Sequence, residues 1–223
     1  MIVSVMAKPK ISVNELGKYL DTSDDLKRRS ILKNQKEQNP SIGSYWNDAE
    51  KSITKFIAGN MKDEDILVSA IDRLHSTPSR SPVGETRKSY NITAIERFHG
   101  MYQRLPAFNM AFQKAPPKGW KIIVGGVEIN IRPEIILTGS KDNGGIKLFF
   151  GGRTSGISTE SMETVAALLH YGLGNNGMKV KQSSCLLVDV FNQSWQAAPA
   201  TYKMRMRRLE ATCTGIKLLW ETI

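Results

Sequence analysis

The chain is predicted to be an α/β protein, with helices in its N-terminal part and a mixed β-sheet in its C-terminal part. Two observations lead to this prediction. Apolar residues recur at helical spacing over about the first hundred residues. From Trp120 onward, apolar and polar residues alternate, as expected for strands. A second helical pattern and the apolar run 184–191 follow, which adds a buried strand to the sheet.

The first part of the chain is predicted to form four helices, each with a polar residue at its start. Ser12 and Glu15 have the spacing of a capping box, in which the serine hydroxyl and the glutamate satisfy free amides of the first turn. Gly59 is expected to end the third helix. The predicted helices begin near Ser12, at Thr22 or Ser23, at Asn47 and at Glu64.

A linker is predicted over residues 76–84. This segment holds two prolines, three serines and one glycine, a composition that does not continue a helix. It divides the chain into an N-terminal helical segment, 1–80, and an α/β core, 81–223. The core is expected to open with a helix that Asn91 caps and Pro106 ends.

Three successive strands are predicted next, as a meander. Gly125 and Gly126 form a tight turn between strands 120–124 and 127–137, and the polar turn 139–145 leads to strand 146–150. A helix opening at Ser158, the strand 184–191 and a basic helix from about Tyr202 complete the expected order.

The net charge of +10, from 31 basic and 21 acidic residues, favours a polyanionic partner such as DNA or RNA. The alternative is that the excess serves solubility alone. Two helical clusters are candidates for phosphate contacts, although such runs are also common on solvated faces. They are Lys27, Arg28 and Arg29 in the second helix and Arg205, Arg207 and Arg208 in the last. For Gly151, Gly152 and Arg153, an ordinary loop is preferred over a phosphate-binding turn.

The cysteine pattern and the hydropathy favour a cytoplasmic protein. Cys185 and Cys213 belong to no CxxC motif, so neither a disulfide framework nor a zinc site is expected. No apolar run approaches the length needed to cross a bilayer, so no membrane partner is expected.

The strongest functional pattern is a glutamate after a proline on one predicted strand and a lysine on the next. Glu134 follows Pro133, and Lys147 lies on the strand after the turn. Each residue alone could be a solvated position of an alternating strand. Together with the order helix, three strands, helix, strand, however, the pair resembles the PD-(D/E)XK nuclease superfamily over about residues 91–200.

The resemblance implies a restriction-endonuclease-like core with a central mixed sheet and a Mg²⁺ site. It assigns Glu134 and Lys147 as catalytic residues, with the metal held by Glu134 and by Glu96 of the preceding helix. One departure is clear, because the family's second strand carboxylate is replaced by Gly145. Some relatives carry this acid on the following helix, where Glu163 or Glu160 could supply it. Asp142 and Glu128 are weaker candidates.

The function implied by the resemblance is nucleic-acid binding with Mg²⁺-dependent cleavage of phosphodiester bonds. Nucleases of this kind are common in DNA processing, restriction, mobile elements and antiviral defence. The alternative, favoured by Gly145, is a catalytically inactive scaffold or adaptor that acts by binding nucleic acid or protein. A small-molecule enzyme is disfavoured because no cofactor motif is present.

Overall fold

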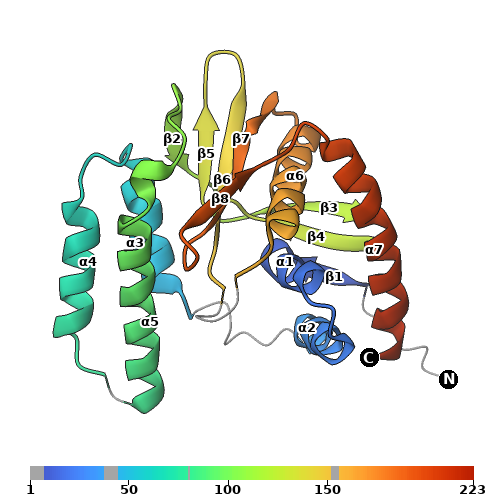
Figure 1. Ribbon diagram of the computed structural model, residues 1–223, viewed down its shortest axis with the longest axis horizontal. Helices are drawn as coiled ribbons and strands as arrows, with labels where there is room; N and C mark the ends of the chain where they lie inside the picture. The colour runs from blue at the N-terminus through green and yellow to red at the C-terminus, as the bar shows by residue number, and fades with distance from the viewer. Residues whose placement is uncertain (1–7, 38–44, 80, 152–155) are drawn as a thin grey trace.

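Two mixed β-sheets lie at the centre of the fold, with helices packed on both sides (Figure 1). The structure is a computed structural model that describes residues 8–37, 45–79, 81–151 and 156–223. The strands are β1 (Lys10–Ser12), β2 (Ala111–Lys114), β3 (Trp120–Val124), β4 (Val127–Ile131), β5 (Ile135–Thr138), β6 (Asn143–Phe149), β7 (Val180–Asp189) and β8 (Ser194–Ala197). The α/β class predicted from the sequence is therefore confirmed.

The helices flank these sheets in chain order. They are α1 (Val13–Asp21), α2 (Asp25–Glu37), α3 (Asn47–Ala58), α4 (Asp65–Ser76), α5 (Pro82–His99), the short 3-10 helix η1 (Tyr102–Arg104), α6 (Thr159–Asn175) and α7 (Tyr202–Thr222). No helix in the described ranges is long and apolar enough to cross a membrane.

The larger sheet has five strands in the order β2-β5-β6-β7-β8. Strands β6 and β7 are parallel and are joined through α6, whereas the other neighbours are antiparallel. The smaller sheet has the order β1-β4-β3, with β1 parallel to β4. Gly125 and Gly126 adopt φ angles of 54° and 82° in the β3–β4 turn, as their predicted hairpin requires.

The predicted strand 127–137 is in fact two strands in different sheets. Strand β4 ends at Ile131, and β5 begins at Ile135 in the larger sheet. Pro133 lies between them and has no backbone N–H to continue a ladder. The predicted three-strand meander was therefore wrong in its first member, because β2, which was not predicted, takes the place of β3 beside β5.

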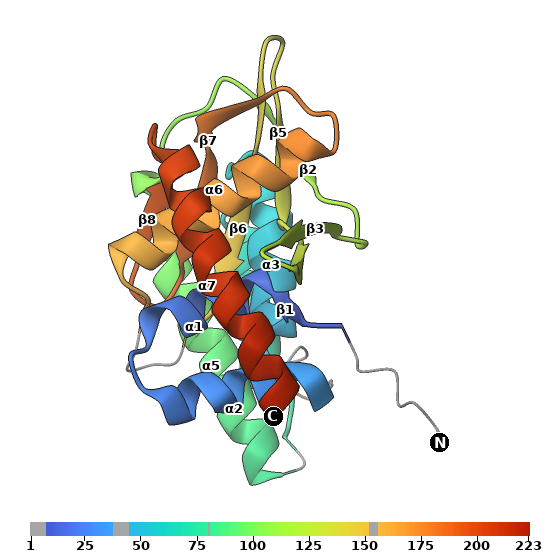
Figure 2. The same cartoon turned by 90° about the vertical axis from the view of Figure 1, so that its right-hand side faces the viewer.

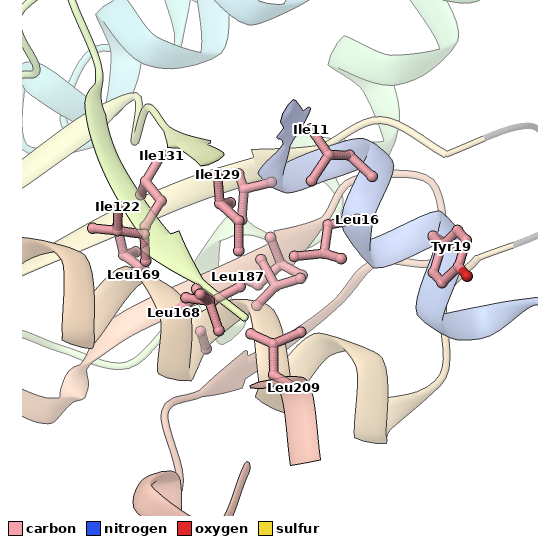
Figure 3. Packing of buried hydrophobic residues seen from close by; sticks show 14 of the residues in the cluster. Ile11, Leu16, Tyr19, Ile122, Ile129, Ile131, Leu168, Leu169, Leu187 and Leu209 are labelled. Carbon is pink, nitrogen blue, oxygen red and sulfur yellow. The ribbon is translucent and has the colours of Figure 1, made fainter. Parts of the chain in front are cut away.

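Each face of the larger sheet buries its own hydrophobic cluster. One cluster joins the sheet to α6, α7, α1 and the smaller sheet, and Figure 3 shows its packing around Leu168, Leu187 and Ile129. The other joins the opposite face to α3, α4 and α5. Ile135, Leu137, Ile146 and Leu148 share this second face, as the alternating pattern predicted.

Residues before 80 contribute to both clusters. Strand β1 pairs with β4, and α1 packs against α6, so residues 8–37 belong to the first cluster. Helices α3 and α4 pack against α5 and belong to the second. The expected division near residue 80 therefore does not coincide with a break in packing.

Helix starts follow the predicted chemistry with two exceptions. Ser12 Oγ accepts a hydrogen bond from Glu15 N at 3.3 Å, and Gly59 follows the last residue of α3, as predicted. Asp24, rather than Thr22 or Ser23, caps α2 by accepting from the backbone of its first turn.

The second exception is α5, which begins well before Asn91. Ser81 caps this helix, and Pro82 occupies its first turn, where a missing N–H costs nothing. The predicted linker is therefore shorter than residues 76–84, and Arg80 within it lies outside the described residues. Asn91 lies inside the helix and is fully buried.

Candidate functional site

Glu134 and Lys147 form a nearly buried ion pair on the larger sheet. The distance between Lys147 Nζ and Glu134 Oε1 is 2.5 Å, and the two residues are 6% and 5% exposed. The register that pairs Ile135 with Ile146 places them directly opposite each other on the same face. The structure thus brings the predicted pair together in the predicted orientation.

Both carboxylate oxygens of Glu134 have partners. Lys147 donates to one oxygen, and the backbone N–H of Leu148 donates to the other at 2.5 Å. Burial raises the pKa of Glu134, which the charge of Lys147 and the Leu148 hydrogen bond oppose and the charge of Glu50 reinforces. This carboxyl group is consequently held by geometry and depends on Lys147 for its negative charge.

Glu50 is the acidic residue of this site that the sequence analysis missed. It lies in the first turn of α3, and its carboxylate accepts from Arg132 at 2.5 Å. Arg132 immediately precedes Pro133 and Glu134, so the ion pair draws the start of α3 towards β5. The sequence signal read as a helix cap was in fact a site residue, because local spacing does not reveal which strand a helix start will meet.

A side chain from another helix positions the α3 start. The N-cap position of α3 is Trp46, which makes no side-chain cap. Instead Asn91 Oδ1 accepts from Ala49 N at 2.9 Å, and Asn91 Nδ2 donates to Tyr45 O at 2.8 Å and to Arg87 O at 2.9 Å. Asn91 therefore fixes the helix turn that carries Glu50.

A cleft of about 410 Å³ opens beside these residues. Lys147, Glu50 and Arg132 form part of its wall, while Glu134 lies behind Lys147. Helices α1 and α2, the start of α3 and the ends of β4 and β6 supply the remainder. The further lining residues are Ser12, Val13, Asn14, Glu15, Lys18, Asn34, Gln35, Trp46, Asn130 and Phe150.

The other predicted metal ligands lie outside this cleft. Glu96 is exposed on α5, a helix that packs on the opposite face of the sheet. Glu160 and Glu163 of α6 both bind Arg205 of α7. Within the described parts of the chain, no group of three or more histidine, cysteine, aspartate or glutamate side chains could hold a metal ion.

The weaker acidic candidates are also committed elsewhere. Glu128 pairs with Lys121 at 2.8 Å, and Asp142 pairs with Lys179 at 3.5 Å. The Glu128 pair joins two strands of the smaller sheet, and Asp142 lies in the turn before β6. Neither residue lines the cleft.

Gly145 faces an apolar wall, which explains why an acid there is disfavoured. A Cβ atom at this position would lie 3.1 Å from Leu173 Cδ1 and 3.6 Å from Leu169 Cδ2 of α6. A carboxylate at residue 145 would therefore enter the packing of α6 on the sheet rather than water or a polar cleft.

The basic candidates differ in their availability. In α2, Lys27 and Arg28 lie 4.0 and 3.8 Å from aspartates of the same helix, and Arg29 is exposed. In α7, Arg205 is largely buried between Glu160 and Glu163. Arg208 lies 3.2 Å from Glu160, whereas Arg207 is exposed. Arg205 is thus engaged in holding α7 to α6.

The segment with Gly152 and Arg153 lies outside the described residues, so the structure places no phosphate-binding turn there. The candidate site is the cleft with Glu50, Glu134 and Lys147. In comparison with known proteins, no family model matches the chain, and no curated protein matches it.

Proposed function

We propose that the protein binds nucleic acid and cleaves a phosphodiester bond with Mg²⁺ in the cleft beside Lys147. The observation that carries the proposal is the convergence of Glu50, Glu134 and Lys147 from a helix and two adjacent strands. A helix carboxylate, a strand carboxylate and a lysine on the next strand are also the residue types implied by the resemblance to PD-(D/E)XK nucleases. Here Glu50 takes the role that the sequence analysis gave to Glu96.

The carboxylates of Glu50 and Glu134 fit the smallest donor set for Mg²⁺. This ion prefers oxygen ligands and is often held by one or two carboxylates together with water and substrate phosphate. The charge of Glu50 contributes to raising the pKa of Glu134, so the two acids lie within electrostatic reach of each other. When bound, the ion supplies charge neutralisation at the phosphoryl oxygens and a more acidic water.

The charges around the cleft support a role for a divalent cation. Lys147 pairs with Glu134, Arg132 pairs with Glu50, and Lys18 pairs with Glu15 at 2.7 Å. A phosphate entering this balanced set gains little net attraction. Compensation of Glu50 and Glu134 by a cation would leave Lys147 and Arg132 with donors for phosphate oxygens.

Within this proposal Lys147 and Arg132 have distinct tasks. The Lys147 ammonium group is almost excluded from solvent, where a positive charge interacts strongly with a developing negative charge. It would orient the attacking water or contact the phosphoryl oxygen. Arg132, which is more exposed, would hold a neighbouring phosphate oxygen.

The test is cleavage of end-labelled single-stranded and duplex DNA and RNA with Mg²⁺, Mn²⁺ or EDTA. We expect cleavage that EDTA abolishes and that Glu134→Gln, Glu50→Gln and Lys147→Met each reduce at least a hundredfold, as for loss of a group that stabilises the transition state. Glu128→Gln is the matched control, because Glu128 is paired with a lysine outside the cleft. Cleavage that survives Glu134→Gln would contradict the assignment.

A second candidate function, a catalytically inactive nucleic-acid-binding scaffold, is favoured by Gly145. The leucines of α6 leave no polar space for an acid at that position. Binding of nucleic acid with no cleavage in Mg²⁺ or Mn²⁺, and no change in melting temperature with either ion, would select this alternative.

A further inference from the structure

The cleft beside Lys147 has the size of a site for a small ligand rather than of a groove for a double helix. Its volume is about 410 Å³, and ligand pockets commonly span about 300 to 1,000 Å³. The Lys147 side chain is only 7% exposed. A phosphate that reaches it must therefore enter the cleft.

The chemistry of the wall is divided among the elements that form it. The sheet supplies cations, Lys147 and Arg132, whereas α1 and α2 supply the amides of Asn14, Asn34 and Gln35. Amide side chains offer a donor and an acceptor together, which suits the edge of a nucleobase.

Aromatic side chains complete this wall. Trp46, before α3, stacks on Phe150, after β6, with ring centroids 5.7 Å apart and planes 15° from parallel. Both residues line the cleft. A planar base has favourable contacts with such rings.

One amide of the wall lacks a partner. Asn14 Oδ1 is buried, and among the described residues no donor lies within hydrogen-bonding distance of it. A buried acceptor without a donor is costly. An exocyclic amino group of a base entering the cleft would provide the donor.

We infer that the cleft binds one unpaired nucleotide, with its phosphate towards Lys147 and Arg132 and its base towards Asn14 and Gln35. This inference rests on the proposed function and narrows its substrate class to single strands, overhanging ends or nucleotides turned out of a duplex. A paired base is held in the stack of a double helix and does not present its pairing edge to the Asn14 side of the wall.

The experiment measures binding of a fluorescent single-stranded oligonucleotide by anisotropy, with a blunt duplex, the same duplex with an overhang, a nucleoside monophosphate or inorganic phosphate as competitor. Catalysis is prevented by using Glu134→Gln alongside the native chain in EDTA. We expect the single strand and the overhang to compete at least tenfold better than the blunt duplex. The nucleoside monophosphate should likewise exceed inorganic phosphate.

Asn14→Ala tests the base contact directly. We expect it to weaken competition by the nucleoside monophosphate about threefold to tenfold, as for loss of one hydrogen bond, and to leave competition by phosphate unchanged. Asn109→Ala is the control, because Asn109 is an exposed amide that does not line the cleft.

The outcomes separate this inference from the proposed function. A blunt duplex that competes as well as the single strand, or a monophosphate no better than phosphate, overturns the inference while nucleic-acid binding stands. Binding of the monophosphate without binding of any oligonucleotide overturns the proposed function but supports the nucleotide site. If neither ligand binds, both are overturned.

Discussion

At the scale of single residues, Lys147 is the partner that allows Glu134 to be charged inside the protein. The pair is nearly excluded from water, and burial raises the pKa of Glu134 above its ordinary value of 4.5. Removing one member of a buried ion pair is more damaging than replacing both, because a charge is then left without compensation.

Lys147→Met should therefore destabilise the protein in a pH-dependent manner. We expect a loss of about 3 to 5 kcal/mol at neutral pH and a much smaller loss near pH 4.5, where glutamate of the unfolded chain is half protonated. The sign follows from a folded-state pKa raised by burial, since stability from the protonated group is lost as pH rises through that pKa. Urea unfolding from pH 4 to pH 8 measures it.

The control for this prediction is the double variant Glu134→Gln with Lys147→Met. Its stability should depend on pH much less than that of Lys147→Met, because no buried carboxylate remains to be ionised. Equal pH profiles for the single and double variants would contradict the role given to Glu134.

At the scale of elements, α3 depends on α5 for its N-terminal cap. Asn91 of α5 satisfies Ala49 N and holds the carbonyl group of Tyr45, while Glu50 follows one residue later. The helix on which the site depends is thus positioned by a polar contact between helices inside the second hydrophobic cluster.

Asn91→Ala should lower the free energy of unfolding by about 1 to 3 kcal/mol, because it leaves buried donors and acceptors without partners. It should also reduce cleavage or nucleotide binding by displacing Glu50. Thermal unfolding and the cleavage assay measure the two effects. Asn109→Ala, which removes an exposed amide, should change neither, and an unaffected Asn91→Ala variant would refute this account of α3.

At the scale of the whole molecule, α7 connects the N-terminal helices to the sheets. Figure 2 shows α7 running across the face that faces the viewer, with its C-terminal end beside α2. Lys36 of α2 donates to the Trp220 carbonyl oxygen at 3.0 Å, and Arg205 ties the other end of α7 to α6. The exposed arginines Arg29 and Arg207 lie on these two helices.

Nucleic-acid binding should weaken steeply with salt, and Arg29 and Arg207 should contribute to that dependence. We expect the double variant Arg29→Ala with Arg207→Ala to bind more weakly and to reduce the slope of log affinity against log salt by about 2, one for each lost phosphate contact. Anisotropy titrations at several salt concentrations measure the slope. The control Lys62→Ala removes an exposed charge between α3 and α4 and should leave it unchanged.

Arg205→Ala should behave differently from the exposed arginines. It removes the cation between Glu160 and Glu163, so the expected result is a lower melting temperature rather than a changed salt slope. A changed salt slope with normal stability would place Arg205 among the phosphate contacts after all.

The sequence by itself determined the α/β class, most helix starts, the β3–β4 turn and the pairing of Glu134 with Lys147. These features depend on short-range chemistry: caps, glycine conformations, and the period of two that sets which strand residues share a face. Both members of the pair lie close in sequence, on strands joined by one turn.

Only the tertiary structure decided which third acid meets this pair and where the chain changes sheets. Glu50 is separated from Glu134 by helices and strands, and its place follows from the Asn91 contact and the Arg132 ion pair. Strand β3 is adjacent to β4 but not to β5, because the chain leaves one sheet at Pro133. Such long-range contacts depend on how whole elements pack, and no local pattern encodes that packing.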